Sequence, residues 1–281
     1  NMLLIADSGS TKTTWSILNK NLEDTIFIET SGINPFYQNT TEIYKVLEQE
    51  FNSDTKEIDA IWFYGAGCAN NSTKKTVGDA LKQFFISKKV HIESDLMAAA
   101  RALCGDKEGI ACILGTGSNS CHYDGRDIIA NVPPLGFILG DEGSGAVIGK
   151  QFLSDILKNQ IPEELTQKFF KTFNTDTTKI LNHIYKQPFQ NRYTAGFTRF
   201  IAENISHPEL HKLVKSSFDQ FLERNVKQYA KSPSLPIHFT GSIASVFKPI
   251  LEESLVTYQL TCGKILKTPM KRLIDFHSSN I

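Results

Sequence analysis

Residues 7–13, Asp-Ser-Gly-Ser-Thr-Lys-Thr, have the composition of a turn that binds phosphate. Asp7 ends an apolar run, and Gly9 permits the close backbone approach that a tight turn needs. Such a turn can cradle phosphate oxygens while the carboxylate holds a magnesium ion through water. The segment is not a Walker A loop, because G-x-x-x-x-G-K-[ST] is absent, and an ordinary hairpin turn is the alternative interpretation. The donors to phosphate would be Ser8, Gly9, Ser10, Thr11 and Lys12.

A second glycine-rich turn, Gly-Thr-Gly-Ser-Asn-Ser, occupies residues 115–120. Like the first, it follows an apolar run and leads into an alternating strand, which suggests that one β-rich fold is used twice. A third segment at residues 65–70, Gly-Ala-Gly-Cys-Ala-Asn, lies between a predicted strand and a predicted helix. The segments at residues 65–70 and 115–120 both lack the third glycine of a dinucleotide-binding fingerprint, so neither predicts an NAD site.

Three further segments place polar groups at the ends of predicted strands or the starts of helices. In residues 136–145, Asp141 and Glu142 stand between glycines, where solvated loop carboxylates are the alternative interpretation. Asp95 opens a helix and could be an N-cap. It could equally be a general base, because ligands bind at strand ends in open α/β sheets. Residues 239–244, Phe-Thr-Gly-Ser-Ile-Ala, end a strand and begin a helix whose donors suit an anion or a nucleotide.

The elements that position these segments are predicted from hydrophobic periodicity. The first half alternates strands with helices, which indicates an α/β fold with a parallel sheet beside an antiparallel meander. Strands are expected at residues 2–6, 13–18, 25–29, 58–64, 90–93, 109–114, 121–123, 127–132 and 235–239, followed by a further strand after an intervening helix. Helices are expected at residues 41–51, 71–85 and 96–103, through most of 145–230 with breaks at Pro162 and Pro188, and from about Pro269.

Composition excludes several classes of function. Thirty basic side chains balance thirty acidic ones, so the basic footprint of a nucleic-acid partner is absent. No apolar stretch approaches 18 residues, and the short apolar run before Asp7 does not resemble a signal peptide, so no membrane association is expected. The five cysteines lack CxxC spacing. Reduced thiols in a cytoplasmic protein are therefore the expected state, with neither a zinc site nor a disulfide framework.

Taken in order from Asp7 to about Ala244, these segments resemble the actin/hexokinase/Hsp70 ATPase superfamily. More closely, they resemble its BadF/BadG/BcrA/BcrD-type branch, which contains N-acetylglucosamine kinases and the activator ATPases of benzoyl-CoA reductase. The Gly-Asp-Glu-Gly-Ser-Gly run is the most specific element. The resemblance implies two RNase H-like lobes, at residues 2–108 and 109–281, with ATP in a central cleft. The second lobe would carry a helical insertion, and the last helix could pack back on the first.

The resemblance also implies a role for each matched residue. Asp7 would organise Mg²⁺, and Asp95 would be the general base that takes the proton from a sugar hydroxyl. The phosphates of ATP would lie between the first turn and Thr116, Gly117 and Ser118. Gly241 and Ser242 would lie by the nucleoside. Asn34, Asn119 and Asp141 would hold the hydroxyls or the acetamido group of an amino sugar.

Two departures from the family pattern bear on these roles. Sugar kinases of the branch often carry Trp between glycines before the acidic loop, whereas this chain has Pro134-Leu135-Gly136, so the sugar pocket could differ. A small glycine often follows proline in the last helix, whereas here Lys271 and Arg272 bring two bulky cations. The resemblance is compatible with a homodimer.

The sequence therefore predicts an ATP-dependent phosphotransferase acting on a hydroxyl of a small sugar, such as N-acetylglucosamine. Two alternatives stay open. An activator ATPase would couple hydrolysis to electron transfer and would hold an iron–sulfur cluster between subunits through two cysteines per chain. A regulatory or filament-forming nucleotide-binding protein would bind ATP without transferring phosphate to an acceptor.

Overall fold

A computed structural model describes residues 2–19 and 25–278. Residues 279–281, the end of the expected second lobe, lie outside that description. Contacts divide the chain into two compact units. Unit 1 contains the chain up to Lys107, the short segment Gly125–Asp127 and the segment from Thr268 onward. Unit 2 contains Glu108–Asp124 and Ile128–Lys267.

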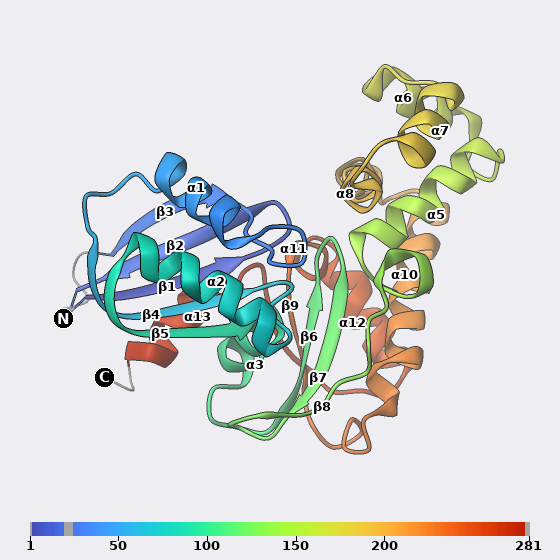
Figure 1. Ribbon diagram of the computed structural model, residues 1–281. Helices are drawn as coiled ribbons and strands as arrows, with labels where there is room; N and C mark the ends of the chain where they lie inside the picture. The colour runs from blue at the N-terminus through green and yellow to red at the C-terminus, as the bar shows by residue number, and fades with distance from the viewer. Residues whose placement is uncertain (1, 20–24, 279–281) are drawn as a thin grey trace. The chain divides into compact units, whose positions relative to one another are not determined.

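Unit 1 is built on a five-stranded mixed sheet (Figure 1). Its spatial order is β3-β2-β1-β4-β5. The first three strands pair antiparallel, and β1, β4 and β5 pair in parallel, so the predicted meander beside a parallel sheet is confirmed. The strands are β1 (Leu3–Ser8), β2 (Lys12–Leu18), β3 (Ile26–Ser31), β4 (Glu57–Gly65) and β5 (Ile86–Ser94).

Alternation along β1 explains why helices pack on both faces of this sheet. Leu4 and Ala6 join a buried cluster with α1 (Thr40–Glu50) and α2 (Asn71–Phe84). Leu3 and Ile5 join another with α3 (Asp95–Cys104) and α13 (Met270–Ser278). Successive strand side chains point to opposite faces, so a continuously apolar strand requires cover on both sides.

Unit 2 repeats the same sheet topology (Figure 1). The order is β10-β9-β6-β7-β8, with β6, β7 and β8 antiparallel and β6, β9 and β10 parallel. The two-sheet α/β fold expected from the repeated strand-turn pattern is confirmed. The strands are β6 (Gly109–Leu114), β7 (Ser118–Tyr123), β8 (Ile128–Ala130), β9 (Ile237–Thr240) and β10 (Cys262–Leu266).

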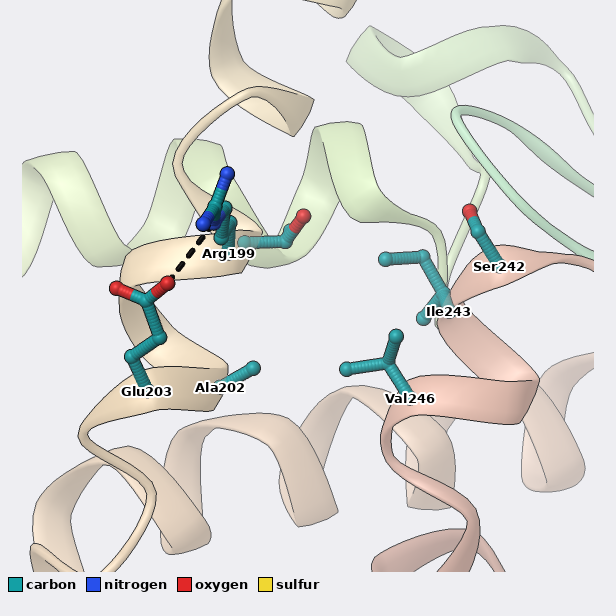
Figure 2. Close-up of a pocket in the computed structure, with 7 residues that line it drawn as sticks. Arg199, Ala202, Glu203, Ser242, Ile243 and Val246 are labelled. Atoms are coloured by element: carbon teal, nitrogen blue, oxygen red, sulfur yellow. Dashed lines mark hydrogen bonds and ion pairs between the residues drawn. The ribbon is translucent and has the colours of Figure 1, made fainter.

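A helical segment follows β8, as expected from residue 145 onward. Pro162 is the N-cap of α6, and Pro188 separates α7 from α8, so both predicted breaks are confirmed. The helices are α4 (Gly136–Leu139), α5 (Gly145–Leu157), α6 (Glu163–Phe173), α7 (Thr177–Lys186), α8 (Gln190–Ala195), α9 (Thr198–Glu203) and α10 (Pro208–Arg224). After β9 come α11 (Ser242–Val246) and α12 (Lys248–Thr257). Helix α9 faces α11 across a pocket (Figure 2).

Apolar packing in unit 2 forms one large buried cluster that joins β6 and β9 to α5, α10 and α12. Within the described ranges, 2–19 and 25–278, no helix is both long enough and apolar enough to cross a membrane.

Candidate functional site

Two carboxylates lie at the carboxyl edge of the parallel strands in unit 1. Asp7 is the penultimate residue of β1, and Asp95 opens α3 immediately after β5. Strand β4 lies between them, with Tyr64 in register with both Asp7 and Glu93. Parallel strands of an open α/β sheet bring ligand-binding groups together at this edge, so the fold explains why two acids distant in sequence are neighbours.

Burial gives this pair an unusual electrostatic character. It raises the pKa of Asp7 to about 7, an effect that the Asp95 carboxylate increases and Lys12 opposes. Burial also raises the pKa of Asp95, although hydrogen bonds from backbone N–H groups partly offset the rise. Carboxylates with pKa values raised by burial and by a neighbouring charge are typical of functional sites.

The β1–β2 turn is held by its own backbone. The Gly9 N–H donates to the Lys12 carbonyl at 3.0 Å. The Ser8 hydroxyl is buried, lies 2.7 Å from Thr13 Oγ1, and accepts from the Ile33 N–H at 2.9 Å. It therefore ties the turn to the segment after β3. The more exposed groups of the turn, and hence its candidate phosphate donors, are Gly9, Ser10, Thr11 and Lys12.

Asn34 lies next to this turn because Ile33 is bonded to Ser8. Its Oδ1 accepts from the Phe36 N–H at 2.9 Å. A Cβ placed on Gly67 would lie 2.1 Å from that oxygen, so the turn after β4 also approaches Asn34 closely. Unit 1 thus gathers Asp7, the β1–β2 turn, Asn34 and Asp95, which were all singled out from sequence, at one end of its sheet.

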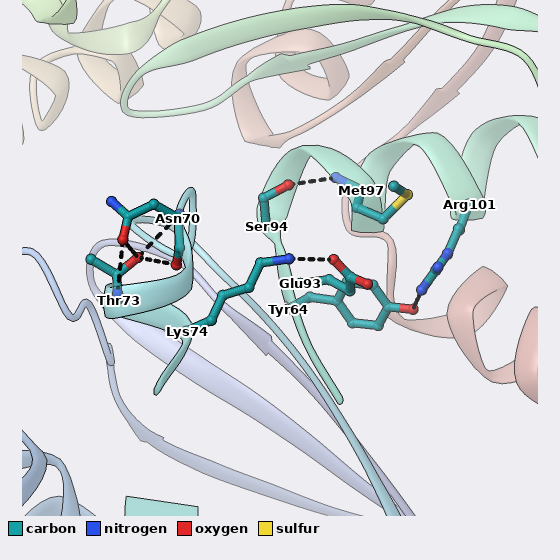
Figure 3. Close-up of polar contacts among 8 residues, drawn as sticks. All are labelled: Tyr64, Asn70, Thr73, Lys74, Glu93, Ser94, Met97 and Arg101. Atoms are coloured by element: carbon teal, nitrogen blue, oxygen red, sulfur yellow. Dashed lines mark hydrogen bonds and ion pairs between the residues drawn. The ribbon is translucent and has the colours of Figure 1, made fainter. Parts of the chain in front are cut away.

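Around the start of α3 lie polar side chains that sequence reasoning did not single out, among them Lys74, Tyr64 and Arg101 (Figure 3). Ser94 caps α3 by accepting the Met97 N–H at 3.1 Å. The preceding residue, Glu93, pairs with Lys74 of α2 at 2.9 Å. Further along α3, Arg101 donates to the Tyr64 hydroxyl at 2.8 Å. No local pattern marks Lys74 or Arg101, because their partners come from distant parts of the sequence.

In unit 2, the β6–β7 turn is fixed to the start of α5. The Gly115 N–H donates to the Gly117 carbonyl at 2.9 Å. In return, the Gly145 N–H donates to the Gly115 carbonyl at 2.8 Å, and the Ala146 N–H donates to the Thr116 carbonyl at 3.1 Å. The glycines around the acidic loop therefore allow the helix to dock directly on the turn.

Asp141 reaches the same turn. Its Oδ1 accepts from the Ser118 N–H at 3.3 Å, and its backbone has a left-handed φ of 52°. Burial raises the pKa of Asp141 to about 6. The Ser118 hydrogen bond partly offsets this rise, and the nearby charge of Glu142 adds to it. A Cβ on Gly117 would lie 3.2 Å from Asp141 Oδ2. Glycine at this position thus keeps the carboxylate close to the turn.

The neighbouring acid, Glu142, has a different role that the sequence did not separate from that of Asp141. It is buried, and its Oε1 accepts from Arg224 Nε at 2.5 Å. Asn225 Nδ2 approaches its other oxygen at 3.4 Å. Glu142 therefore anchors the acidic loop to the end of α10.

The two remaining sequence-predicted positions of unit 2 are Asn119 and the Gly241–Ser242 turn. Asn119 lies in β7, and its Oδ1 accepts from Asn131 Nδ2 at 3.0 Å. Gly241 has a φ of 126°, and a Cβ there would lie 2.2 Å from the Leu114 carbonyl. Ser242 is exposed and begins α11. The turn after β9 is therefore stacked on the end of β6.

The next question is whether protein side chains alone could hold a metal ion. Among the residues that the structure describes, no group of three or more His, Cys, Asp or Glu side chains could hold a metal ion. A pair of carboxylates nevertheless suits Mg²⁺, which usually keeps several waters and binds one or two carboxylates plus substrate phosphates. Cys68 and Cys104 are buried, and burial raises the pKa of the Cys68 thiol to about 12.

Comparison with known proteins identifies relatives over nearly the whole chain. A profile of the BadF/BadG/BcrA/BcrD ATPase family matches residues 6–250. The structure of a candidate N-acetylglucosamine kinase from Porphyromonas gingivalis has 45% identity, covers 99% of each chain and gives a TM-score of 0.95. An N-acetylmuramic acid/N-acetylglucosamine kinase from Clostridium acetobutylicum is 26% identical over 211 residues, 69% of this chain and 68% of the relative. A Chromobacterium violaceum structure with 17% identity, 98% coverage of each chain and a TM-score of 0.74 shares the fold.

Proposed function

The chain belongs to the BadF/BadG/BcrA/BcrD ATPase family, and from that premise we propose that it is an ATP-dependent kinase of a small amino sugar. The observation that carries the proposal is the pair of half-buried carboxylates, Asp7 and Asp95, at one sheet edge, both with raised pKa values. N-acetylglucosamine is the first acceptor to test, because relatives from Porphyromonas gingivalis and Clostridium acetobutylicum bear that sugar in their names.

In this proposal Asp95 accepts the proton of the attacking sugar hydroxyl. The hydroxyl oxygen forms a bond to the γ-phosphorus of ATP as the bond from that phosphorus to the β–γ bridging oxygen breaks, and ADP leaves. A base helps only if it is unprotonated and close to the hydroxyl. Burial makes the Asp95 carboxylate more basic than an exposed aspartate, which favours proton transfer.

Asp7 fits a role in holding magnesium. Its carboxylate is desolvated and lies in the field of a second carboxylate, so a bound cation would offset both costs. Mg²⁺ would neutralise phosphate charge during transfer. The β1–β2 turn and Thr116, Gly117 and Ser118 would donate to phosphate oxygens through backbone N–H and hydroxyl groups.

The acceptor would be oriented by polar side chains that stand near these turns. Asn34 belongs to the unit 1 group, while Asn119 and Asp141 flank the β6–β7 turn of unit 2. Amide and carboxylate groups can bind several sugar hydroxyls with fixed geometry. Positioning of this kind, and exclusion of water as a competing acceptor, account for much of catalysis in phosphoryl transfer.

The direct experiment measures ADP release from MgATP with a panel of amino sugars and simple hexoses. We expect one N-acetylated amino sugar to stimulate ADP release strongly over the sugar-free rate, with sugar phosphate formed in equal amount. The control is the same panel with Asp95→Asn. Uniformly low ADP release with every sugar, from protein that binds MgADP, would contradict the kinase proposal.

The activator ATPase alternative is disfavoured by the cysteines of unit 1. Ligation of a shared iron–sulfur cluster needs thiolates that can reach a partner subunit. Cys68 and Cys104 are buried, and the raised pKa of Cys68 opposes formation of its thiolate. Iron bound stoichiometrically to protein purified without oxygen would reverse this preference.

A further inference from the structure

One face of the unit 1 sheet carries Asp7 and, beside it, a row of aromatic side chains. Tyr64 of β4 is in register with Asp7 of β1 and with Glu93 of β5. Register partners in neighbouring strands point to the same face of a sheet, so Tyr64 is the cross-strand neighbour of Asp7 on that face. One step earlier along the same face, Trp62 stacks on His91 with ring centroids 4.0 Å apart. Helices α3 and α13 cover this aromatic row.

The Tyr64 hydroxyl joins three elements of unit 1. The side chain of this tyrosine is fully buried. Its hydroxyl accepts from Arg101 Nη1 of α3 at 2.8 Å, as Figure 3 shows, and lies 2.7 Å from His277 Nε2 of α13. One hydroxyl on β4 is thereby bonded to both helices that cover the sheet. Because an unpaired polar group in a buried setting is costly, the three groups are held together.

The guanidinium of Arg101 lies close to three aromatic rings as well as being bonded to Tyr64. Its central carbon is 5.2 Å from the ring centroid of Trp62, 5.7 Å from that of Tyr64 and 5.6 Å from that of Phe276. Cations at such distances from ring faces are attracted by the ring quadrupole. The guanidinium is planar and its donors have fixed directions, so the rings and the Tyr64 hydroxyl together define one orientation for it.

The contacts of Arg101 do more than attach α3 to the sheet. Apolar residues of α3, such as Ala98 and Ala102, already pack in the buried cluster on that face. A half-buried cation adds a desolvation cost that an apolar residue at position 101 would avoid. What Arg101 supplies instead is a directional bond to β4, which limits how far α3 can slide or rotate on the strand.

Asp95 opens the helix that Arg101 holds, whereas Asp7 lies on the strand next to Tyr64. We propose that Arg101 and Tyr64 are positioning residues, which fix α3 on β4 so that the Asp95 carboxylate stays aligned with Asp7 at the sheet edge. This inference rests on the proposed function, in which Asp95 is the general base. Small displacements of a base lower the rate steeply, because proton transfer needs hydrogen-bond distance. The two residues therefore act on the chemical step through Asp95, and not on nucleotide binding.

The first test is Tyr64→Phe, which removes the hydroxyl and keeps the ring. With the sugar that best stimulates ADP release, we expect kcat to fall about 5- to 50-fold, below the roughly 100-fold loss that a displacement of about 1 Å can cause. The KM for ATP and the MgADP affinity should stay within about twofold, because α3 contributes none of the candidate phosphate donors. The MgADP stoichiometry from calorimetry gives the folded fraction, so unfolded protein is not counted as a loss of kcat.

Substitutions of Arg101 distinguish the direction of its bond from its charge. Arg101→Met, which keeps an apolar stem but removes the donors, should lower kcat as far as Tyr64→Phe does. Arg101→Lys should recover only part of that loss, because an ammonium keeps the charge and a donor but has no planar face for the rings. The matched control is Tyr44→Phe, which removes a tyrosine hydroxyl from α1, a helix that packs on the other face of the same sheet. It should leave kcat and MgADP affinity unchanged.

A double mutant separates positioning from a general loss of structure. If Tyr64 acts through the Asp95 carboxylate, Tyr64→Phe should lower kcat no further in protein that already carries Asp95→Asn, because the effects of residues that act as a unit are not additive. The same fold-loss in both backgrounds would show a merely structural role and would overturn the inference.

Wild-type activity separates this inference from the proposed function. Wild-type protein with sugar-stimulated ADP release, together with an unchanged kcat in Tyr64→Phe, would overturn the inference alone. Wild-type protein that no sugar stimulates would overturn the kinase proposal, and the positioning role with it.

Discussion

At the scale of single residues, the chemical role of Asp95 can be tested apart from its structural role at the first turn of α3. Replacing it by asparagine keeps the side-chain shape and retains an oxygen that can accept the Leu96 N–H, which Asp95 Oδ1 accepts at 2.9 Å. We expect Asp95→Asn to bind MgADP normally and to lose at least about 100-fold in turnover, the lower end of a general base's contribution. Coupled ADP-release kinetics and calorimetry would measure the two quantities.

The control for Asp95 is Asp79→Asn, which removes a half-exposed carboxylate on α2 that pairs with Lys75. It should retain full turnover. If Asp95→Asn turned over sugar at a near-normal rate, the assignment of the general base would be wrong.

Asp7 should act through the metal rather than through the proton. Asp7→Ala removes a carboxylate whose charged form is disfavoured by burial and by Asp95, so that a bound cation would stabilise it. We expect it to weaken ADP binding in the presence of Mg²⁺ by about tenfold or more, since a charged contact of this kind is worth roughly 1.5–3 kcal/mol. Binding in excess chelator should change little. Calorimetry that gave the same MgADP affinity as wild type would contradict the metal role.

The residue scale also marks a limit of sequence reasoning. Asp141 and Glu142 are adjacent in the same glycine-rich run, and nothing local distinguishes them. The structure separates them because the left-handed backbone at Asp141 directs successive side chains apart, one to Ser118 and the other to Arg224. A partner about eighty residues away, such as Arg224, carries no signal in the run itself.

At the scale of elements, two mid-helix glycines differ in whether a side chain could be accommodated. A Cβ on Gly149 of α5 would lie 1.9 Å from the Thr194 carbonyl of α8, whereas a Cβ on Gly78 of α2 would lie 3.7 Å from Ile92 Cγ1. We expect Gly149→Ala to destabilise unit 2 by roughly 1–3 kcal/mol through overpacking. Gly78→Ala should stabilise unit 1 by about 0.5–1 kcal/mol through helix propensity.

Chemical denaturation followed by circular dichroism would measure both glycine variants. Each serves as the control for the other, because both introduce one methyl group into a helix. A stabilising Gly149→Ala would show that α5 and α8 can separate at little cost, contrary to the close approach described here.

Elements were predicted best where apolar periodicity was strong and poorly where packing was weak. The order of strands and helices in unit 1 and the proline breaks follow from the sequence pattern. Strand β5 starts at Ile86, four residues before the predicted start. Its first residues were missed because Lys88 and Lys89 break the apolar pattern, as charged residues commonly do in an edge strand. Helix α4 was not predicted, since four residues with exposed Ile138 and Leu139 show no helical pattern.

At the scale of the whole molecule, each unit contains a histidine that burial keeps neutral. In unit 1, His277 Nε2 lies 2.7 Å from the Tyr64 hydroxyl, and burial, Arg101 and His91 lower its pKa to about 3. In unit 2, His238 Nδ1 accepts from the Lys264 N–H at 2.8 Å, and burial followed by Lys264 lowers its pKa to about 4.

On acidification, these two histidines lower the unfolding free energy, whereas the raised pKa values of Asp7, Asp95 and Asp141 act in the opposite direction. An unfolded histidine takes up a proton near pH 6.5, whereas the folded ones resist it. At these two positions the unfolded chain therefore binds more protons below pH 6.5, and each histidine should cost up to about 1.4 kcal/mol of unfolding free energy per pH unit down to about pH 4. Denaturant titrations at pH 7.5, 6 and 5 would measure the slope.

Replacement of either histidine should remove its share of that slope. Relative to wild type, His277→Gln and His238→Gln should each gain unfolding free energy as the pH falls from 6.5 to 5, even if each variant is less stable at pH 7.5. A slope unchanged in both variants would assign the acid sensitivity to other groups.

The repeated sheet topology is the feature of the whole molecule that sequence predicted most directly, because each unit begins with a buried strand, a glycine-serine turn and a polar strand. The pocket between α9 and α11 could not be predicted in this way. Its walls come from short helices separated by about forty residues, and neither helix carries a motif.

Helix α13 has a consequence for the order in which the protein is made. Met270 and Leu273 of this helix pack with Leu3 and Ile5 of the first strand, yet the ribosome synthesises all of unit 2 between them. The emerging chain must therefore carry an apolar sheet face that only α3 can cover until the last turns of α13 leave the exit tunnel. We expect chaperones to bind that face during translation, and a ribosome that stalls within unit 2 would leave a first unit unable to complete its core.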